Sequence, residues 1–173
     1  VNKGKIKTYL MNNDGKEMIT GLFNEGDFFG YADLLQEQNH SDTAQAMEET
    51  EVLLIPKEDF YSLIYRNSEV SKKFIKMLTN NLKEKEEQLI SIAYNSVRKR
   101  VADALLLLKK RYDKETVPHF TINILREDLA NMVGTATETI SRTLSDFKDE
   151  KLIDIRASNI TLLDIKHLES MKN

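Results

Sequence analysis

Two short runs of the chain, residues 5–11 and 18–23, alternate between apolar and polar side chains, as the two faces of a half-buried β-strand require. Residues 12–15 between them read Asn-Asn-Asp-Gly, a combination that favours the tight turn of a β-hairpin. Residues 43–48 and 51–55 are further predicted strands. The pattern therefore predicts an antiparallel β unit made of short strands and tight turns.

The apolar pattern changes to a helical period after this unit. Pro56 and the acids that follow it suit the first turn of a short helix. Ser68 then begins a long helical stretch that contains neither Gly nor Pro up to residue 117. Along it a heptad seam, with Lys85 as a polar interruption, is formed by Leu78, Leu82, Leu89 and Ile92. Such a seam indicates either a helix packed on its own β unit or, as we favour, a helix that pairs with a second copy of the chain.

A second amphipathic helix follows Asn95-Ser96, where the pattern shifts, and a linker is expected at 113–119. The apolar face of that helix is formed by Val101, Ala104, Leu105 and Leu108, and a strand is predicted at Phe120, Ile122 and Ile124. Two short helices follow over 126–133 and 137–149, separated by Gly134. A hairpin of 152–155 with 160–163 and a last short helix end the chain. Two short helices joined by a Gly-containing turn are the signature of a helix-turn-helix, and the hairpin after them adds a wing.

The stretch GTATETISR gathers four hydroxyl side chains, an acid and a base at the start of the second of these helices. We expect Thr135 and Thr137 to cap the helix and to contact DNA phosphates. Glu138, Ser141 and Arg142 share one face, where Arg can bond guanine O6 and N7, Glu can accept from cytosine N4, and Ser adapts to either. The competing interpretation is a capped helix with an ordinary Glu138–Arg142 pair, which contributes only about 0.2–0.5 kcal/mol. The flanking helix, the turn glycine and the wing favour the DNA interpretation.

The composition indicates a soluble globular chain and excludes several kinds of site. Of the 173 residues, 40% are hydrophobic, and the longest apolar run, 104–108, is far shorter than the roughly 20 residues of a membrane span. The absence of Cys excludes disulfides, thiolate metal sites and Cys-held iron–sulfur clusters, and fits a reducing cytoplasm. His40, His119 and His167 stand far apart without ligand spacing, so we expect surface histidines and no bound metal.

Charge is distributed unevenly along the chain. Residues 1–67 carry 6 basic and 12 acidic side chains, residues 68–96 carry 5 and 4, and residues 97–173 carry 14 and 12. An acidic front and a slightly basic back predict two parts with different tasks. The chain begins with Val on a predicted strand, and we expect an N-terminal segment to precede it.

These features together resemble the Crp/Fnr family of bacterial transcription regulators. LANMVGTATETISRTLSDFKDEKLI, residues 129–153, is similar to the family's helix-turn-helix, and KGKIKTYL, GDFFGYADLL and EVLLIP are similar to its β-roll. The resemblance implies an α+β fold in three parts. These are a jelly-roll-like antiparallel β-roll sensor domain over 1–67 that lacks its N-terminal part, a dimerisation helix with a hinge over 68–96, and a winged helix-turn-helix DNA-binding domain over 97–173.

The resemblance also implies what the recognition helix reads. The Fnr-type pattern Glu-x-x-Ser-Arg falls on Glu138, Ser141 and Arg142, which read TTGA-like half-sites in that branch, whereas the cyclic-AMP branch usually has Arg at Thr137. Leu125 stands where the family usually has a Ser or Thr cap, which removes one expected phosphate contact. We predict base contacts from Thr137, Glu138, Ser141 and Arg142, and phosphate contacts from Arg126 and Thr135.

The residues that the family's nucleotide-binding members use differ in this chain. Those members have Glu after the glycine that aligns with Gly30, and an Arg-Ser pair for the phosphate, where this chain has Tyr31 and His40-Ser41. A neutral His is a poor substitute for a bidentate Arg. The Thr-Ser pair that contacts adenine aligns with Lys85-Glu86. We therefore predict a degenerate effector pocket that does not bind a cyclic nucleotide, formed by Gly30, Tyr31, His40, Ser41 and Lys85.

We expect double-stranded DNA and a second copy of the chain as partners, in the cytoplasm. RNA polymerase and an unidentified small-molecule effector are further candidates, and we expect no cofactor and no membrane. The chain has no Gly-x-Ser-x-Gly, P-loop or metal motif, which argues against an enzyme. Two alternatives stay open: a dimeric ligand-binding or scaffolding protein whose helix-turn-helix serves protein contacts, and a constitutive DNA-binding protein whose β-roll only assists dimerisation.

Overall fold

The computed structural model describes residues 1–113 and 120–173, so most of the predicted linker, with His119, lies outside the described residues. The elements, in chain order, are β1 (Ile6–Met11), β2 (Glu17–Phe23), α1 (Tyr31–Leu35), β3 (Thr43–Ala46), α2 (Lys57–Arg66), α3 (Ser68–Tyr94), α4 (Val97–Tyr112), β4 (Thr121–Asn123), α5 (Arg126–Val133), α6 (Thr137–Asp149), β5 (Ile153–Arg156), β6 (Asn159–Leu162) and α7 (Ile165–Ser170). The fold is α+β, as predicted.

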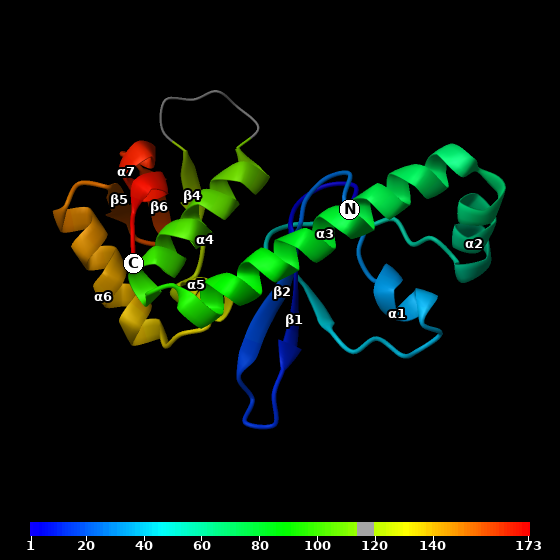
Figure 1. Ribbon diagram of the computed structural model, residues 1–173, viewed down its shortest axis with the longest axis horizontal. Coiled ribbons are helices and arrows are strands. Elements are labelled where there is room, and N and C mark those ends of the chain that lie inside the picture. The colour runs from blue at the N-terminus through cyan, green and yellow to red at the C-terminus, as the bar shows by residue number, and fades with distance from the viewer. Residues whose placement is uncertain (114–119) are drawn as a thin grey trace.

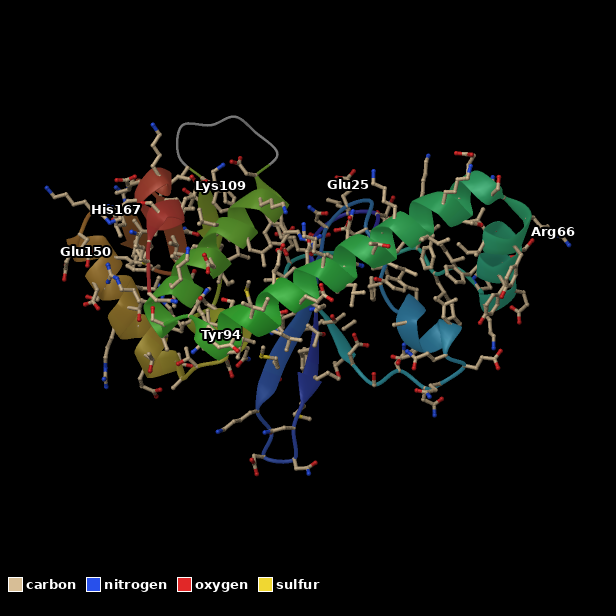
Figure 2. All side chains as sticks on the ribbon, viewed as in Figure 1. Glu25, Arg66, Tyr94, Lys109, Glu150 and His167 are labelled. Atoms are coloured by element: carbon tan, nitrogen blue, oxygen red, sulfur yellow. The ribbon has the colours of Figure 1, made fainter. Side chains whose placement is uncertain are left out.

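The long helix α3 organises the molecule. It runs lengthwise, with α1 and α2 near one end, the β1–β2 hairpin projecting from its middle, and α4 to α7 gathered at the other end (Figure 1). Figure 2 shows the same division through its labelled side chains, with Arg66 at one extremity and Glu150 and His167 at the other.

The front part is a three-stranded sheet in the order β2-β1-β3. Its strands are antiparallel, as the alternating pattern predicted. Its hairpin forms at the predicted turn. The Oδ1 atom of Asn12 accepts hydrogen bonds from the N–H groups of Asp14 and Lys16 at 3.0 and 2.9 Å. Gly15 has a φ of 76°, a left-handed value that glycine adopts without a Cβ clash. The chemistry of the turn therefore sets the register of the hairpin.

The predicted strand at 51–55 was wrong. Within the described residues only Glu51 pairs with another segment, in an isolated bridge, and Val52, Leu53 and Leu54 are 52%, 73% and 90% exposed. A strand needs a neighbouring strand to satisfy its N–H and C=O groups. An apolar run in the sequence does not reveal whether such a neighbour is present.

α3 begins at the predicted residue and ends beside the predicted break. The Oδ1 atom of Asn67 caps it by accepting hydrogen bonds from two first-turn N–H groups at 3.1 and 3.2 Å. α2 packs on α3 through Phe60 and Phe74, whose ring centroids are 5.5 Å apart. None of the 27 residues of α3 is fully buried by the rest of the described chain. A single chain therefore leaves much of this helix open to another partner.

The break between α3 and α4 lies at Asn95 and Ser96, where the sequence pattern placed it. Asn95 is extended, with φ −86° and ψ 143°, and the Oγ atom of Ser96 caps α4 by accepting from the N–H of Lys99 at 3.2 Å. The side chain of Asn173 forms hydrogen bonds to the backbone on both sides of this break. Its Oδ1 accepts from the N–H of Ser96 at 3.0 Å and its Nδ2 donates to the carbonyl of Tyr94 at 3.3 Å.

The back part is built around one apolar core. An antiparallel sheet in the order β4-β6-β5 forms there, and the predicted hairpin and last helix are present. The predicted face of α4 is buried at Val101, Ala104, Leu105 and Leu108. Side chains from the other helices and the sheet that are at most 1% exposed include Leu129, Ile140, Phe147, Ile160 and Leu168.

The front and back parts touch through β2 and α5. Ile19 and Leu22 of β2 belong to the same buried cluster as the core of the back part. The Nδ2 atom of Asn131 on α5 donates to the Oε2 of Glu17 at 3.4 Å. Nothing in the sequence pattern indicated this contact, which places the helix-turn-helix directly against the sheet.

Candidate nucleic-acid interface

The helix-turn-helix consists of α5, a turn at Gly134, and α6, as predicted. Gly134 has a φ of 71°, and the N–H groups of Gly134 and Thr135 both donate to the carbonyl of Ala130, at 2.8 and 3.1 Å. A glycine in the left-handed conformation commonly ends a helix in this way. The positive φ is therefore the constraint at this position, because a Cβ at Gly134 would make only an ordinary contact, 3.6 Å from an Nη atom of Arg100.

Apolar packing holds the angle between the two helices. Leu129, Ala130 and Val133 of α5 and Ile140 and Leu144 of α6 are each at most 2% exposed and belong to one buried cluster. This is the packing that the sequence spacing predicted. The turn and the packing together fix how α6 is presented.

α6 directs one polar face to solvent. Ile140, Thr143, Leu144 and Phe147 are buried on its inner side. Of its exposed residues, the four nearest the start of the helix form what we call the recognition face: Thr137, Glu138, Ser141 and Arg142. The structure therefore brings the four residues predicted to contact bases together on one open surface.

The predicted capping of α6 by Thr135 or Thr137 was wrong. The N-cap is Ala136, and no side chain among the described residues accepts a hydrogen bond at this cap. Thr137 already lies inside the helix and Thr135 lies one residue too early, so neither hydroxyl occupies the capping position. The helix start is left with N–H groups that lack a side-chain cap, and such groups attract phosphate oxygens.

Glu138 and Arg142 do not pair with each other. Within residues 1–113 and 120–173, no ion pair or hydrogen bond joins either side chain to another residue. Ser141 donates from Oγ to the carbonyl of Thr137 at 3.0 Å, which leaves its hydroxyl lone pairs available. The competing interpretation of this stretch required a Glu138–Arg142 pair and a side-chain cap, and the structure has neither there.

Arg126 stands at the start of α5 beside the wing. Its Nη2 donates to the carbonyl of Ala157 at 3.3 Å, and its Nη1 is buried without a hydrogen-bond partner among the described residues. Partial burial lowers the pKa of Arg126. A phosphate oxygen at this position would supply the missing hydrogen-bond acceptor.

The wing carries a basic residue that was not among the predicted DNA contacts. Arg156 ends β5 with its side chain 88% exposed, and its Nε lies 3.1 Å from an Oδ of Asp154. The next residue, Ala157, turns the hairpin with a φ of 54°. The available signal was an Arg placed directly before the turn of a hairpin that follows a helix-turn-helix.

Comparison with known proteins assigns both parts of the chain. Residues 1–67 match the cyclic nucleotide-binding domain and residues 99–171 match the Crp-like helix-turn-helix domain. The cAMP-activated global transcriptional regulator CRP of Pasteurella multocida is 32% identical over 92% of this chain and 78% of its own length. The chain belongs to the Crp/Fnr family. It is a DNA-binding transcription regulator and not an enzyme.

Other members of the Crp/Fnr family agree with this assignment. The fumarate and nitrate reduction regulatory protein of Vibrio cholerae is 28% identical over 99% of this chain and 68% of its own length. The structure of FixK2 from Bradyrhizobium japonicum has the same fold, with a TM-score of 0.88, 23% identity, and coverage of 100% of this chain and 85% of that one. Among the described residues of this regulator, no helix is long and apolar enough to cross a bilayer.

In this regulator the five residues of the predicted effector pocket lie at two separate locations. His40 is exposed with its Nδ1 3.7 Å from Asp33, and the N–H of Ser41 donates to the same carboxylate at 3.0 Å. Gly30 begins α1 next to His40. The other two residues, Tyr31 and Lys85, line a cavity under α3. α1 produces this division, because it directs Tyr31 toward α3 while the loop after it carries His40 and Ser41 outward.

His40 also has acidic neighbours that its spacing in the sequence did not reveal. One ligand atom from each of Asp33, His40 and Asp42 lies within 4.8 Å of the other two. Asp33 belongs to α1, which folds back against the loop that carries the other two residues. Exposed acidic groups commonly occur without a bound ion, so the expectation of no bound metal stays a prediction. His40 and His167 are exposed, as predicted.

The predicted dimer seam is an open apolar strip on α3. Leu82 and Leu89 are 62% and 67% exposed, Ile92 is 38% exposed, and Leu78 is half-buried. Ile75, seven residues before Leu82 and 61% exposed, extends the strip and was missed although the same heptad spacing pointed to it.

Lys85, the polar residue within the heptad pattern, is not part of the apolar strip. Its Nζ donates to the carbonyl of Thr20 on β2, and to the Oε1 of Gln88 at 3.3 Å. The polar interruption in the heptad pattern is therefore a contact to the chain's own sheet.

Proposed function

We propose that this Crp/Fnr regulator is a homodimer that reads a palindromic operator with TTGA-like half-sites through the recognition face of α6. One observation carries the proposal. The four residues of the face are exposed together, and Glu138 and Arg142 have no partner in the described chain. The major groove admits an α-helix, and unpaired donors and acceptors near the helix start are available to base edges there.

Each residue of the recognition face has a distinct role in this proposal. Arg142 bonds O6 and N7 of the guanine in the half-site, and Glu138 accepts from N4 of a cytosine on the complementary strand. Ser141 accepts from a neighbouring base through its hydroxyl lone pairs, and Thr137 contributes its methyl group and hydroxyl. A bidentate Arg–guanine contact discriminates against the wrong base by about 1–3 kcal/mol.

Phosphate contacts orient the helix in the groove. We assign these to Arg126, whose Nη1 has no acceptor among the described residues, and to Thr135 at the open start of α6. Phosphate contacts carry no sequence information of their own, so they set the register of the domain while the recognition face sets its specificity.

A palindromic operator requires two copies related by a twofold axis. The apolar strip on α3 supports pairing of this helix with its counterpart, because Leu82 and Leu89 are mostly exposed in the single chain. The two recognition helices would then lie about 34 Å apart, one turn of DNA. A signal in the front part would swing the back part about Asn95 and Ser96, provided that it binds the two arrangements with different affinity.

We propose that a cyclic nucleotide is not this signal, although the Pasteurella relative is by name cAMP-activated. Two hydroxyls at the aligned positions are already engaged: Tyr31 accepts from the Nδ2 of Asn81 at 2.5 Å, and Ser41 is bonded to Asp33. His40 offers no guanidinium for a phosphate. RNA polymerase is the protein partner that we expect at the promoter, and the cytoplasm is the expected location.

The testing experiment measures binding of the purified protein to a TTGA-type palindrome and to a scrambled duplex at near-physiological salt, without added ligand. We expect a strong preference for the palindrome. The logarithm of the binding constant should fall with the logarithm of the salt concentration, with a slope of about −0.9 for each phosphate neutralised. A selection from random duplexes, run in parallel, reports the half-site directly.

The outcomes separate the proposal from its alternatives. Weak binding that is indifferent to sequence, with a small salt slope and no enriched duplex in the selection, contradicts it and supports the scaffolding role. Enrichment of an unrelated half-site overturns the TTGA assignment alone. A strong preference for the palindrome without ligand supports the proposal and indicates that no small-molecule signal is obligatory for DNA binding.

A further inference from the structure

The break between α3 and α4 leaves backbone groups that neither helix satisfies. Tyr94 is the last residue of α3, and Ser96 is the N-cap of α4. Among the described residues no backbone N–H donates to the carbonyl of Tyr94, and the N–H of Ser96 reaches no backbone carbonyl. Such groups are usual at helix ends, where a side chain or water completes their hydrogen bonds. A side chain that bonds to them here also influences how firmly α4 is held against α3.

The side chain of Asn173 bonds to both of these groups. Its Oδ1 accepts from the N–H of Ser96 at 3.0 Å, and its Nδ2 donates to the carbonyl of Tyr94 at 3.3 Å. The same Nδ2 donates to the Oδ1 of Asn95 at 3.4 Å. A primary amide carries an acceptor oxygen and an NH₂ donor group, so this side chain uses both of its polar ends on three consecutive residues. In the described part of the chain no other side chain bonds to the backbone on both sides of the break.

Asn173 is held in place by the back part. It follows α7, whose Leu168 is fully buried, and Met171 packs against the same apolar core. In Figure 1 the chain runs from α7 to the C label, which stands beside the first turn of α4. Figure 2 labels His167 on α7 and Tyr94 at the end of α3, the two elements that this side chain connects. Asn173 therefore joins the core of the back part to the last turn of the long helix.

The backbone at the break has little stiffness of its own. Asn95 has φ −86° and ψ 143°, and Ser96 has φ −59° and ψ 155°, so both are extended and interrupt the helical hydrogen-bond ladder. The Nδ2 of Asn95 reaches an Oδ of Asp103 on α4 only at 3.5 Å, a weak contact. A rotation about these torsions turns the back part relative to α3. It also separates Tyr94 from Ser96 in a way that the amide of Asn173 cannot follow, so these hydrogen bonds oppose it.

We propose that Asn173 is a positioning residue for DNA binding, which fixes the angle at which α4 leaves α3. In a dimer this angle sets the distance between the two recognition faces. A variable angle lowers the gain from binding both half-sites at once, because the second face is then less often in reach of its half-site. Asn173 contacts no base in this account, so its loss leaves the discrimination between bases unchanged. The effect on DNA binding rests on the proposed function, whereas the fixing of the break does not.

The first measurement uses the full chain without DNA and follows amide hydrogen exchange by NMR. We expect the N–H of Ser96 to exchange about tenfold faster in Asn173→Ala, because a donor that has lost its acceptor opens to water more often. Asn173→Asp keeps an acceptor for Ser96 and loses the donor to Tyr94, so Ser96 should stay protected. Lys172→Ala changes an exposed neighbour that has no bond to the break and should behave like the parent. Unchanged exchange of Ser96 in Asn173→Ala overturns the proposal.

The second measurement compares the palindrome that the parent prefers with a duplex that contains only one half of it. Asn173→Ala should lose about fivefold in affinity for the palindrome and bind the single half-site like the parent, with an unchanged urea midpoint. Equal losses on both duplexes show a merely structural role and overturn the proposal. If the parent prefers no duplex, the proposed function fails, and the exchange of Ser96 alone then decides whether Asn173 fixes the break.

Discussion

Lys7 of β1 and Asp128 of α5 form a buried ion pair between the front sheet and the first helix of the helix-turn-helix. Their side chains are 9% and 10% exposed. In so poorly hydrated a place each charge depends on the other for its solvation. The DNA-binding domain is thus tied to the sheet by a charge pair as well as by apolar contact.

Removing one member of this pair should be costly. Lys7→Met leaves the Asp128 carboxylate buried without its partner, and we expect the free energy of unfolding to fall by about 3–5 kcal/mol. Lys7→Met combined with Asp128→Leu should recover most of the loss, because no charge is then left unpaired. Urea unfolding of the two single variants and the double variant measures this. Losses that simply add in the double variant would show that the two charges do not depend on each other.

Tyr112 predicts the behaviour of the protein at alkaline pH. Its hydroxyl is buried without a hydrogen-bond partner among the described residues, and burial raises the pKa of Tyr112 above its usual value. The unfolded chain releases this proton near pH 10 while the folded chain retains it. Stability from this group is therefore complete below about pH 10 and is lost progressively as the pH rises further.

Tyr112→Phe should remove that alkaline loss. The free energy of unfolding at pH 8 should be unchanged or greater by about 1 kcal/mol, because a buried unpaired hydroxyl is removed. The decline between pH 8 and pH 11 should be shallower than in the parent protein. Urea midpoints at the two pH values provide the comparison, with Tyr65→Phe on an 80% exposed tyrosine as the control. If the free energy of unfolding declines equally with pH in the parent and Tyr112→Phe proteins, burial does not keep the Tyr112 hydroxyl protonated in the folded chain.

The local features of the fold could be predicted from the sequence because each has a local cause. The hairpin follows from Asn12 and Gly15, and the helix-turn-helix from Gly134 and the apolar spacing on both sides of it. The break at Asn95 and Ser96 follows from a change in the apolar pattern. In each place a few neighbouring residues determine the backbone.

The features that could not be predicted correctly depend on contacts between residues that are distant in the sequence. Residues 51–55 have strand-like composition, yet Val52 and its neighbours have no pairing strand among the described residues. The heptad pattern could not show that Lys85 bonds to Thr20, and nothing local indicated that Lys7 would meet Asp128. The extent of the cavity under α3 could not be predicted for the same reason, since its walls come from four separate segments.

The apolar strip on α3 predicts how the protein assembles. Leu82→Glu places a charge in the centre of the strip, and we expect it to shift the protein from dimer to monomer, because burying an unpaired carboxylate in an interface is costly. Affinity for the palindrome should fall with it, since each half-site is then bound singly. Sedimentation velocity measures the state. Asn80→Glu adds the same charge on another side of the helix and should remain dimeric. A dimeric Leu82→Glu protein would contradict the proposed seam.

The most direct test of the central claim is the specificity of Arg142→Ala. Affinities of the parent and variant proteins are measured on the TTGA-type palindrome, on a palindrome with the guanine replaced, and on a scrambled duplex at one salt concentration. We predict that the variant loses about 1–3 kcal/mol of its preference for the intact palindrome and no longer distinguishes the guanine position, while scrambled-duplex binding changes far less. Lys148→Ala, on the same helix outside the recognition face, should retain the preference. If Arg142→Ala binds the palindrome with unchanged specificity, the recognition face does not read the operator.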